Sequence, residues 1–217
     1  MGLKYYVIDC ETTGFSPKYH EITEISIIRC DDRNQLSLFL KPQFPQRANP
    51  KSLRVTGRTF KDLFKGIHPK EAVDKINQFV ESDQLTPEHR CFIGHNVQFD
   101  RGFVYFLWNS FGKEFPATCW LDTKTMTKKW ATQLGIEKPK LTLEASLELV
   151  GIKAMPGVHN AVADTRNTYL LWKKGIENGI DYLTALKRFP QFSSSSGSAS
   201  DDISLAELVA EGLEETS

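Results

Sequence analysis

The stretch Tyr5-Tyr6-Val7-Ile8-Asp9-Cys10-Glu11-Thr12-Thr13-Gly14 joins a short apolar run to a pair of acidic residues. The length and composition of Tyr5–Ile8 predict a buried β-strand. Successive side chains alternate in extended backbone, so Asp9 and Glu11 are expected to point to the same side of the strand. Two carboxylates at that spacing repel each other unless a cation lies between them. Thr12–Gly14 then offers two hydroxyls and a glycine where the backbone can approach a ligand closely.

Around this stretch the sequence pattern predicts strands first and helices afterwards. β-rich runs predict further strands at Ile22–Cys30, Gln35–Leu40 and Cys91–Gly94. Apolar residues at spacings of three and four predict helices at Pro69–Val80, Asp100–Phe111, Thr142–Leu149 and Ala161–Trp172. Antiparallel-type strands followed by alternating helices and strands indicate an α/β fold with a mixed sheet flanked by helices.

Two further polar clusters lie at the ends of predicted elements. Gly94-His95-Asn96-Val97-Gln98-Phe99-Asp100 spans a strand-to-helix junction, where functional groups often gather in α/β sheets. In His159-Asn160-Ala161-Val162-Ala163-Asp164, the acid falls one turn into a helix and the histidine precedes that helix. Each cluster also has a structural interpretation. Acid pairs at strand ends are common, Asp100 is placed to cap a helix, and His159 fits a surface or capping position.

Taken together, the three clusters favour chemistry. Carboxylates from separate elements that meet at one sheet edge are tolerable only with bound cations. All-oxygen ligands select hard metals such as Mg²⁺ or Mn²⁺. Two such ions about 4 Å apart can hold a phosphodiester, activate a water and stabilise the leaving oxygen. A nearby histidine such as His159 is a suitable general base for that water. The predicted reaction is therefore phosphodiester hydrolysis.

The sequence resembles the DEDDh exonucleases, most nearly the epsilon proofreading subunits of bacterial DNA polymerase III. The matching motifs run in the family's order over about residues 4–173. They are Asp9-Cys10-Glu11-Thr12-Thr13-Gly14, Glu21-Ile22-Thr23-Glu24-Ile25, Val55-Thr56-Gly57, His95-Asn96-Val97-Gln98-Phe99-Asp100, Leu121-Asp122-Thr123, Leu141-Thr142-Leu143, and His159 with Asp164.

The resemblance implies an RNase H-like fold with a five-stranded mixed β-sheet flanked by α-helices. It implies that Asp9, Glu11 and Asp164 surround one metal, that Asp9 is shared with a second, and that Asp100 completes the site. The activity implied is 3′→5′ exonucleolytic release of nucleoside 5′-monophosphates. Residues implied to meet the 3′-terminal nucleotide or line the site are Thr12, Thr13, Gly14, Asn96 and Phe99. The sequence departs from the family at Arg58, where relatives carry an apolar residue, and a contact from Arg58 to a phosphate is one alternative.

Charge is distributed unevenly along the 217 residues. Residues 201–217 hold six acidic groups and no Lys or Arg, so residues 1–200 carry 27 basic against 21 acidic groups. A net positive body suits a polyanionic partner such as DNA. No apolar run reaches the roughly 18 residues of a membrane span, and the N-terminus has no signal-peptide pattern. With four scattered cysteines, these features predict a cytoplasmic protein with no membrane association.

The C-terminal composition predicts two parts, an exonuclease domain over residues 1–192 and a flexible Ser-rich linker with an acidic amphipathic tail over 193–217. The resemblance suggests that Ile203–Leu213 docks on a DNA polymerase catalytic subunit, and a solvated tail is the alternative. Gln35–Phe39 matches a sliding-clamp-binding peptide, but a core strand is the favoured interpretation. An RNA-trimming exonuclease and a non-catalytic polymerase or clamp accessory protein are the alternative functions.

Overall fold

The computed structural model describes residues 2–156, 159–180 and 186–188. The predicted boundary at residue 192 and the predicted linker and tail at 193–217 therefore lie outside the described residues. Every helix in the described ranges is too short or too polar to traverse a lipid bilayer.

A mixed β-sheet forms the centre of the fold, with strand order β3-β2-β1-β4-β5-β6. The strands are β1 (Lys4–Thr12), β2 (Ile22–Arg29), β3 (Gln35–Phe39), β4 (Arg90–Gly94), β5 (Cys119–Asp122) and β6 (Leu186–Arg188). β1, β4 and β5 are mutually parallel, whereas β2, β3 and β6 pair antiparallel with their neighbours. The expected five-stranded mixed sheet is confirmed, and the short β6 extends it at the β5 edge.

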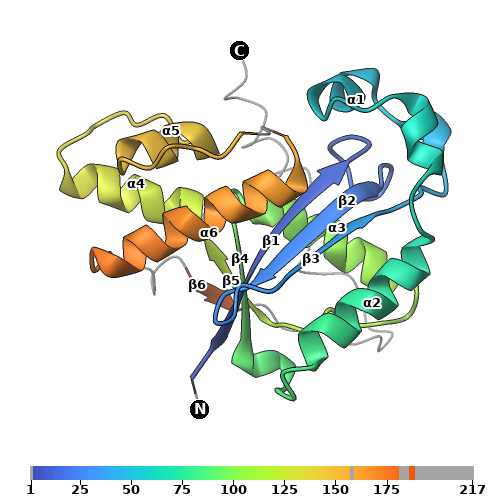
Figure 1. Ribbon diagram of the computed structural model, residues 1–217, viewed down its shortest axis with the longest axis horizontal. Coiled ribbons are helices and arrows are strands. Elements are labelled where there is room, and N and C mark those ends of the chain that lie inside the picture. The colour runs from blue at the N-terminus through green and yellow to red at the C-terminus, as the bar shows by residue number, and fades with distance from the viewer. Residues whose placement is uncertain (1, 157–158, 181–185, 189–217) are drawn as a thin grey trace, which may run out of the picture.

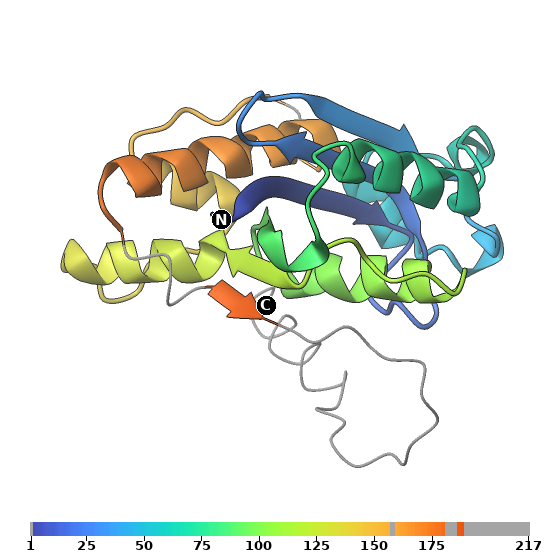
Figure 2. The same ribbon diagram turned by 90° about the horizontal axis from the view of Figure 1, so that it is seen from below.

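Helices cover both faces of this sheet (Figure 1). They are α1 (Pro50–Val55), α2 (Pro69–Glu81), α3 (Gln98–Asn109), α4 (Thr123–Gln133), α5 (Leu143–Leu149) and α6 (Ala161–Glu177). In both views α2 and α3 lie on one side of the sheet and α4, α5 and α6 on the other (Figure 2). The predicted mixed sheet with flanking helices is therefore present.

The alternation of β1 side chains determines which residues meet which helices. Tyr6, Ile8 and Cys10 belong to the core that β1 forms with α2 and α3. Val7 belongs to a second core on the opposite face, where Trp172 of α6 packs. Asp9 and Glu11 have the parity of Val7, so they lie on the face that α6 covers. Burial of the apolar positions thus places two acids beside the helix that carries Asp164.

Several elements differ from the sequence-based expectations. The strand β5 appeared in the sequence only as a family motif, and neither α1 nor α4 was predicted. The helix expected at Asp100–Phe111 begins two residues earlier, at Gln98. The helix expected from Thr142 begins at Leu143, and the Thr142 hydroxyl caps it by accepting from the Ala145 amide. Gln35–Phe39, which matches a clamp-binding peptide, forms strand β3, as favoured.

Candidate active site

The acidic ends of β1 and α6 meet at one edge of the sheet. Ligand atoms of Glu11, His159 and Asp164 all lie within 4.8 Å of one another. Figure 1 shows the end of β1 beside the start of α6, with α1 at the same edge of the sheet. Asp9 precedes Glu11 by two residues on the same face of β1, so its carboxylate belongs to the same group. The structure therefore brings together side chains that are about 150 residues apart in sequence.

Asp100 joins the group from α3. It lies in the first turn of that helix, and its side chain is buried. Its Oδ1 accepts a hydrogen bond of 2.8 Å from the backbone amide of Cys10, the residue between Asp9 and Glu11. Asp100 therefore fastens the start of α3 to the acidic end of β1, and the helix-capping alternative is wrong because Val97 holds the N-cap position.

His159 and Asp164 are positioned by the first turn of α6. The Asn160 side chain caps the helix by accepting from the amides of Val162 and Ala163, so the capping alternative for His159 is wrong. His159 has a left-handed backbone, with φ of 59°, and its amide donates to Asp164 Oδ2 at 3.1 Å. This arrangement leaves the His159 ring exposed to solvent, whereas Asp164 is buried. An accessible imidazole beside a buried carboxylate can exchange protons with bulk water.

Burial raises the pKa of each carboxyl group, and repulsion by other carboxylates of the cluster adds to the shift of Asp9 and Glu11. Burial raises the pKa of Asp9 well above its usual value, and the Asp100 and Glu11 carboxylates add to the shift. Burial likewise raises the pKa of Glu11 to about 8, that of Asp100 to about 7 and that of Asp164 to about 6. The group cannot hold four negative charges at neutral pH without compensation. A cluster of oxygen ligands under this repulsion fits hard divalent cations.

A fifth carboxylate lies behind the cluster. Glu24 of β2 is paired with Glu11 in the strand register, and its side chain is only 2% exposed. Arg58 forms an ion pair with it at 2.6 Å, and the guanidinium also lies 4.4 Å from the centre of the Phe39 ring. Arg58 therefore has a carboxylate partner within the protein, and its contact with a phosphate stays a prediction. The sequence signal for this ion pair was Glu24 itself, because an acid within the apolar run of β2 needs a basic partner when it is buried.

Thr12 and Thr13 brace the loop between β1 and β2. The Thr12 hydroxyl donates to the Gly14 carbonyl at 2.6 Å, and the Thr13 hydroxyl accepts from the Glu21 amide at 2.9 Å. Both side chains are buried. A Cβ on Gly14 would lie 2.2 Å from the His20 ring, so this glycine is required for packing. Contact of Thr12, Thr13 and Gly14 with a nucleotide stays a prediction.

Asn96 and Phe99 lie between β4 and the start of α3. Asn96 is exposed, has a left-handed backbone with φ of 63°, and donates its amide to Asp122 Oδ1 at 3.0 Å. Phe99 packs against Phe103 with ring centres 4.9 Å apart. Their predicted role in lining the site stays a prediction. Phe15, which follows Gly14, was not predicted, although it is 48% exposed at this edge and offers a ring for base stacking.

The family model for exonucleases, RNase_T, matches residues 6–172. The chain belongs to this exonuclease family. Similar curated proteins include a DNA polymerase III PolC-type of Pediococcus pentosaceus, 28% identical over 83% of this chain and 12% of the polymerase. The 3′-5′ DNA exonuclease Cap18 of Escherichia coli is 26% identical over 73% of this chain and 84% of its own length. The 3′-5′ exonuclease DinG of Bacillus subtilis is 28% identical over 80% of this chain and 18% of DinG.

This exonuclease domain also shares its fold with solved structures. An E. coli ExoI–ssDNA complex gives a TM-score of 0.69 at 18% identity, over 85% of this chain and 42% of that one. The nuclease domain of 3′hExo, a DEDDh family member bound to rAMP, gives a TM-score of 0.67 at 15% identity. The match covers 82% of this chain and 94% of that domain. The RNase H-like fold and the DEDDh resemblance are thereby confirmed. Likeness to the epsilon subunit has looser support, and the chain spans under a fifth of the PolC-type and DinG proteins.

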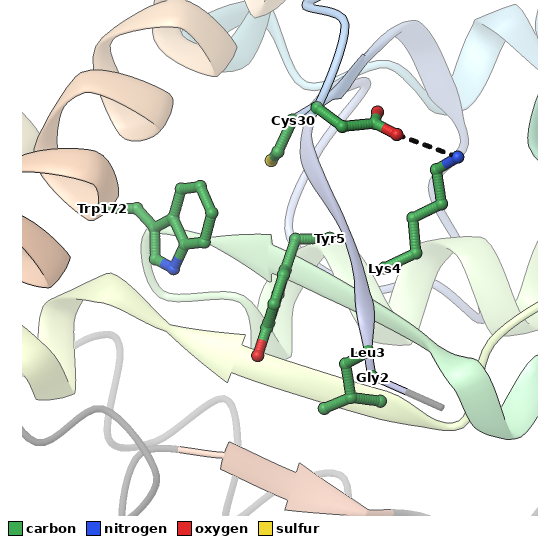
Figure 3. A pocket seen from close by; sticks show the side chains of 7 residues that line it. Gly2, Leu3, Lys4, Tyr5, Cys30 and Trp172 are labelled. Atoms are coloured by element: carbon green, nitrogen blue, oxygen red, sulfur yellow. Dashed lines mark ion pairs between the residues drawn. The ribbon is translucent and has the colours of Figure 1, made fainter.

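A separate cavity of about 350 Å³ lies at the opposite end of β1 (Figure 3). It is lined by Gly2, Leu3, Lys4, Tyr5, Cys30, Asp31 and Trp172. The dashed line in Figure 3 marks the ion pair between Lys4 and Asp31, which measures 3.0 Å. None of the four carboxylates of the candidate active site lines this cavity, so the cavity is distinct from that site.

Proposed function

We propose that this exonuclease domain is a metal-dependent 3′→5′ exonuclease that removes nucleoside 5′-monophosphates from DNA 3′ ends in proofreading or repair. One observation carries the proposal: ligand atoms of Glu11, His159 and Asp164 converge within 4.8 Å, beside the half-buried Asp9 and the buried Asp100. A non-catalytic polymerase or clamp accessory protein has no need for so costly a cluster of acids.

The proposed roles follow from the geometry of each residue. Asp9, Glu11, Asp100 and Asp164 would hold two divalent cations, Mg²⁺ or Mn²⁺. When bound, such ions supply positive charge to the phosphodiester and favour deprotonation of a water. His159 would accept that proton, because its exposed ring lies beside Glu11 and Asp164. Asp164 accepts the His159 amide and so holds the loop that presents the ring.

DNA is the proposed substrate because the names of Cap18 and of the ExoI complex specify DNA. RNA trimming remains the second candidate, since 3′hExo was solved with a ribonucleotide, rAMP. Association with a DNA polymerase catalytic subunit is proposed from the PolC-type relative, with residues 193–217 as the contact. A cytoplasmic location is proposed from the four free cysteines, which suit a reducing compartment.

The deciding experiment compares 5′-labelled single-stranded DNA, double-stranded DNA and RNA of one sequence, each with Mg²⁺, Mn²⁺ or EDTA. We expect shortening from the 3′ end of DNA, release of 5′-monophosphates and no turnover in EDTA. The matched control is Asp9→Asn, which keeps the shape of the side chain and removes its charge. Undiminished hydrolysis in excess EDTA would refute the mechanism, and faster trimming of RNA than of DNA would support the second candidate.

A further inference from the structure

We propose that Tyr19, Phe44 and Arg47, together called the aromatic platform, bind single-stranded nucleic acid upstream of the 3′ end. The inference rests on the proposed nuclease function and adds a second binding site for the same strand. Its consequence is that affinity grows with the length of the strand beyond the nucleotides that occupy the carboxylate cluster.

The platform places a cation against two aromatic rings. The Arg47 guanidinium carbon lies 4.1 Å from the centre of the Phe44 ring and 4.9 Å from that of the Tyr19 ring. Within the part of the chain that the structure describes, Arg47 forms no ion pair with a carboxylate. The rings hold the guanidinium in place, and its charge is left for an external anion.

Both rings remain open to solvent on their other surfaces. Tyr19 is 54% exposed and Phe44 is 41% exposed. Exposed rings of this kind stack on nucleobases with little sequence preference, because every base has a π-face. The adjacent guanidinium is suited to the phosphates that link those bases. This combination of stacking surface and unpaired cation is the chemistry of a single-strand binding site.

Hydrogen bonds connect the platform to the candidate active site. The amides of Gln43 and Phe44 donate to the Glu21 carboxylate at 2.7 and 2.8 Å. Glu21 is joined to Thr13 by two further hydrogen bonds, and the Asn49 amide donates to the Thr13 carbonyl at 2.7 Å. Because Thr13 directly follows the acidic end of β1, the platform has a fixed position beside the catalytic residues.

A groove leads along α3 between these elements. Its volume is about 140 Å³, and its lining includes the platform residues, Lys18 and, from α3, Phe103 and Phe106. The groove lies along the later turns of α3, and the same helix carries Asp100 of the candidate active site in its first turn. The Glu21 carboxylate in this groove is engaged by two amides, whereas Lys18 and Arg47 add positive charge. The net charge therefore favours a polyanionic strand over an acidic or neutral peptide.

The test measures binding without turnover, in an Asp164→Asn background with Ca²⁺, using fluorescein-labelled oligothymidylates of twelve and three nucleotides. We expect Arg47→Gln and Tyr19→Ala each to raise the Kd for the twelve-mer about tenfold, the scale of one lost base-stacking or phosphate contact. The Kd for the three-mer should change less than twofold. Arg33→Gln is the matched control, because it removes the same charge from an exposed turn at the other end of β2.

Thermal unfolding of each variant shows whether the fold is kept, and both substitutions are at solvent-accessible side chains. An unchanged Kd for the twelve-mer in both variants would overturn the proposal and leave the groove to a protein partner. Equal weakening of both oligonucleotides would also overturn it, because the residues would then act at the 3′ end. If the parent enzyme binds the twelve-mer but hydrolyses no substrate, the proposed function fails and the platform stands.

Discussion

The Arg58 guanidinium lies 2.6 Å from the Glu24 carboxylate, and Glu24 is the strand partner of Glu11. Arg58 belongs to the loop after α1, so this ion pair ties that loop to the back of the acidic cluster. Burial raises the pKa of Glu24, and the nearby Arg58 guanidinium opposes that shift by stabilising the carboxylate charge. Arg58, where the sequence departs from the family, therefore compensates the charge of a buried carboxylate next to the site.

Arg58→Ala should destabilise the protein by about 3 kcal/mol, because it leaves a buried carboxylate without its partner. Urea unfolding in EDTA measures the change. The double variant Arg58→Ala with Glu24→Gln should recover part of the loss, since the remaining amide carries no charge. Equal stability of the single variant and the parent would show that water already compensates Glu24.

The cation-free protein should lose stability as pH rises from about 4 to about 8. Burial raises the pKa of Glu11 to about 8 and of Asp100 to about 7, above the ordinary carboxyl values near 4. The folded state thus binds these protons more tightly than the unfolded chain, and the penalty is absent below pH 4 and complete above pH 8. Thermal unfolding across this range, with EDTA and with Mg²⁺, measures the slope.

Added Mg²⁺ should flatten that slope, because the cation replaces the protons. Glu11→Gln should flatten it in EDTA, because the variant has one group fewer to titrate. A slope of opposite sign in the parent protein, after subtraction of the Glu11→Gln profile, would contradict the raised pKa values.

Asp9→Asn should reduce turnover by at least about a thousandfold and raise the melting temperature in EDTA, because it removes a repelling charge. Single-turnover hydrolysis and thermal unfolding are the two measurements. Asp83→Asn is an informative contrast, because Asp83 is the buried partner of Arg90, lies between α2 and β4 and is not part of the cluster. That variant should lower the melting temperature instead. A catalytically active Asp9→Asn protein would remove Asp9 from the metal ligands.

His159→Gln should lower the single-turnover rate by roughly two to four orders of magnitude, the usual scale of general-base catalysis. The anchor to Asp164 should survive, because the His159 amide makes that bond and the ring does not. His159→Asn controls for backbone strain, since asparagine tolerates φ of 59° well. Normal single-turnover rates with weakened DNA binding would exclude His159 as the base.

The parts of the site that follow a short-range rule were accessible from sequence. Two-residue alternation placed Asp9 and Glu11 on one face, because the strand is extended and Val7 is buried with the same parity. Helical periodicity placed Asp164 one turn into α6, and the structure has it there. These are local properties of a strand and a helix, so neighbouring residues determine them.

Other features depend on contacts between distant segments. The helix α4 is rich in Lys and Thr, and its two large apolar residues, Met126 and Trp130, are buried only through packing with α5 and α6. Its periodic signal is therefore weak. The ion pair of Arg58 with Glu24 joins positions 34 apart, which no local pattern encodes. The hydrogen bond from the Glu21 amide to the Thr13 hydroxyl likewise depends on how the loop between β1 and β2 folds back.

The position of Asp164 in the sequence has a consequence for biosynthesis. Its helix, α6, packs across β1 and β2, and all the other carboxylates of the cluster precede it by more than 60 residues. A ribosome therefore releases strands β1 to β5 before it releases the acid that completes the cluster. Until α6 emerges and docks, the nascent polypeptide lacks one of the four carboxylates of the proposed ligand set, so the proposed metal site can form only after α6 has folded onto β1 and β2.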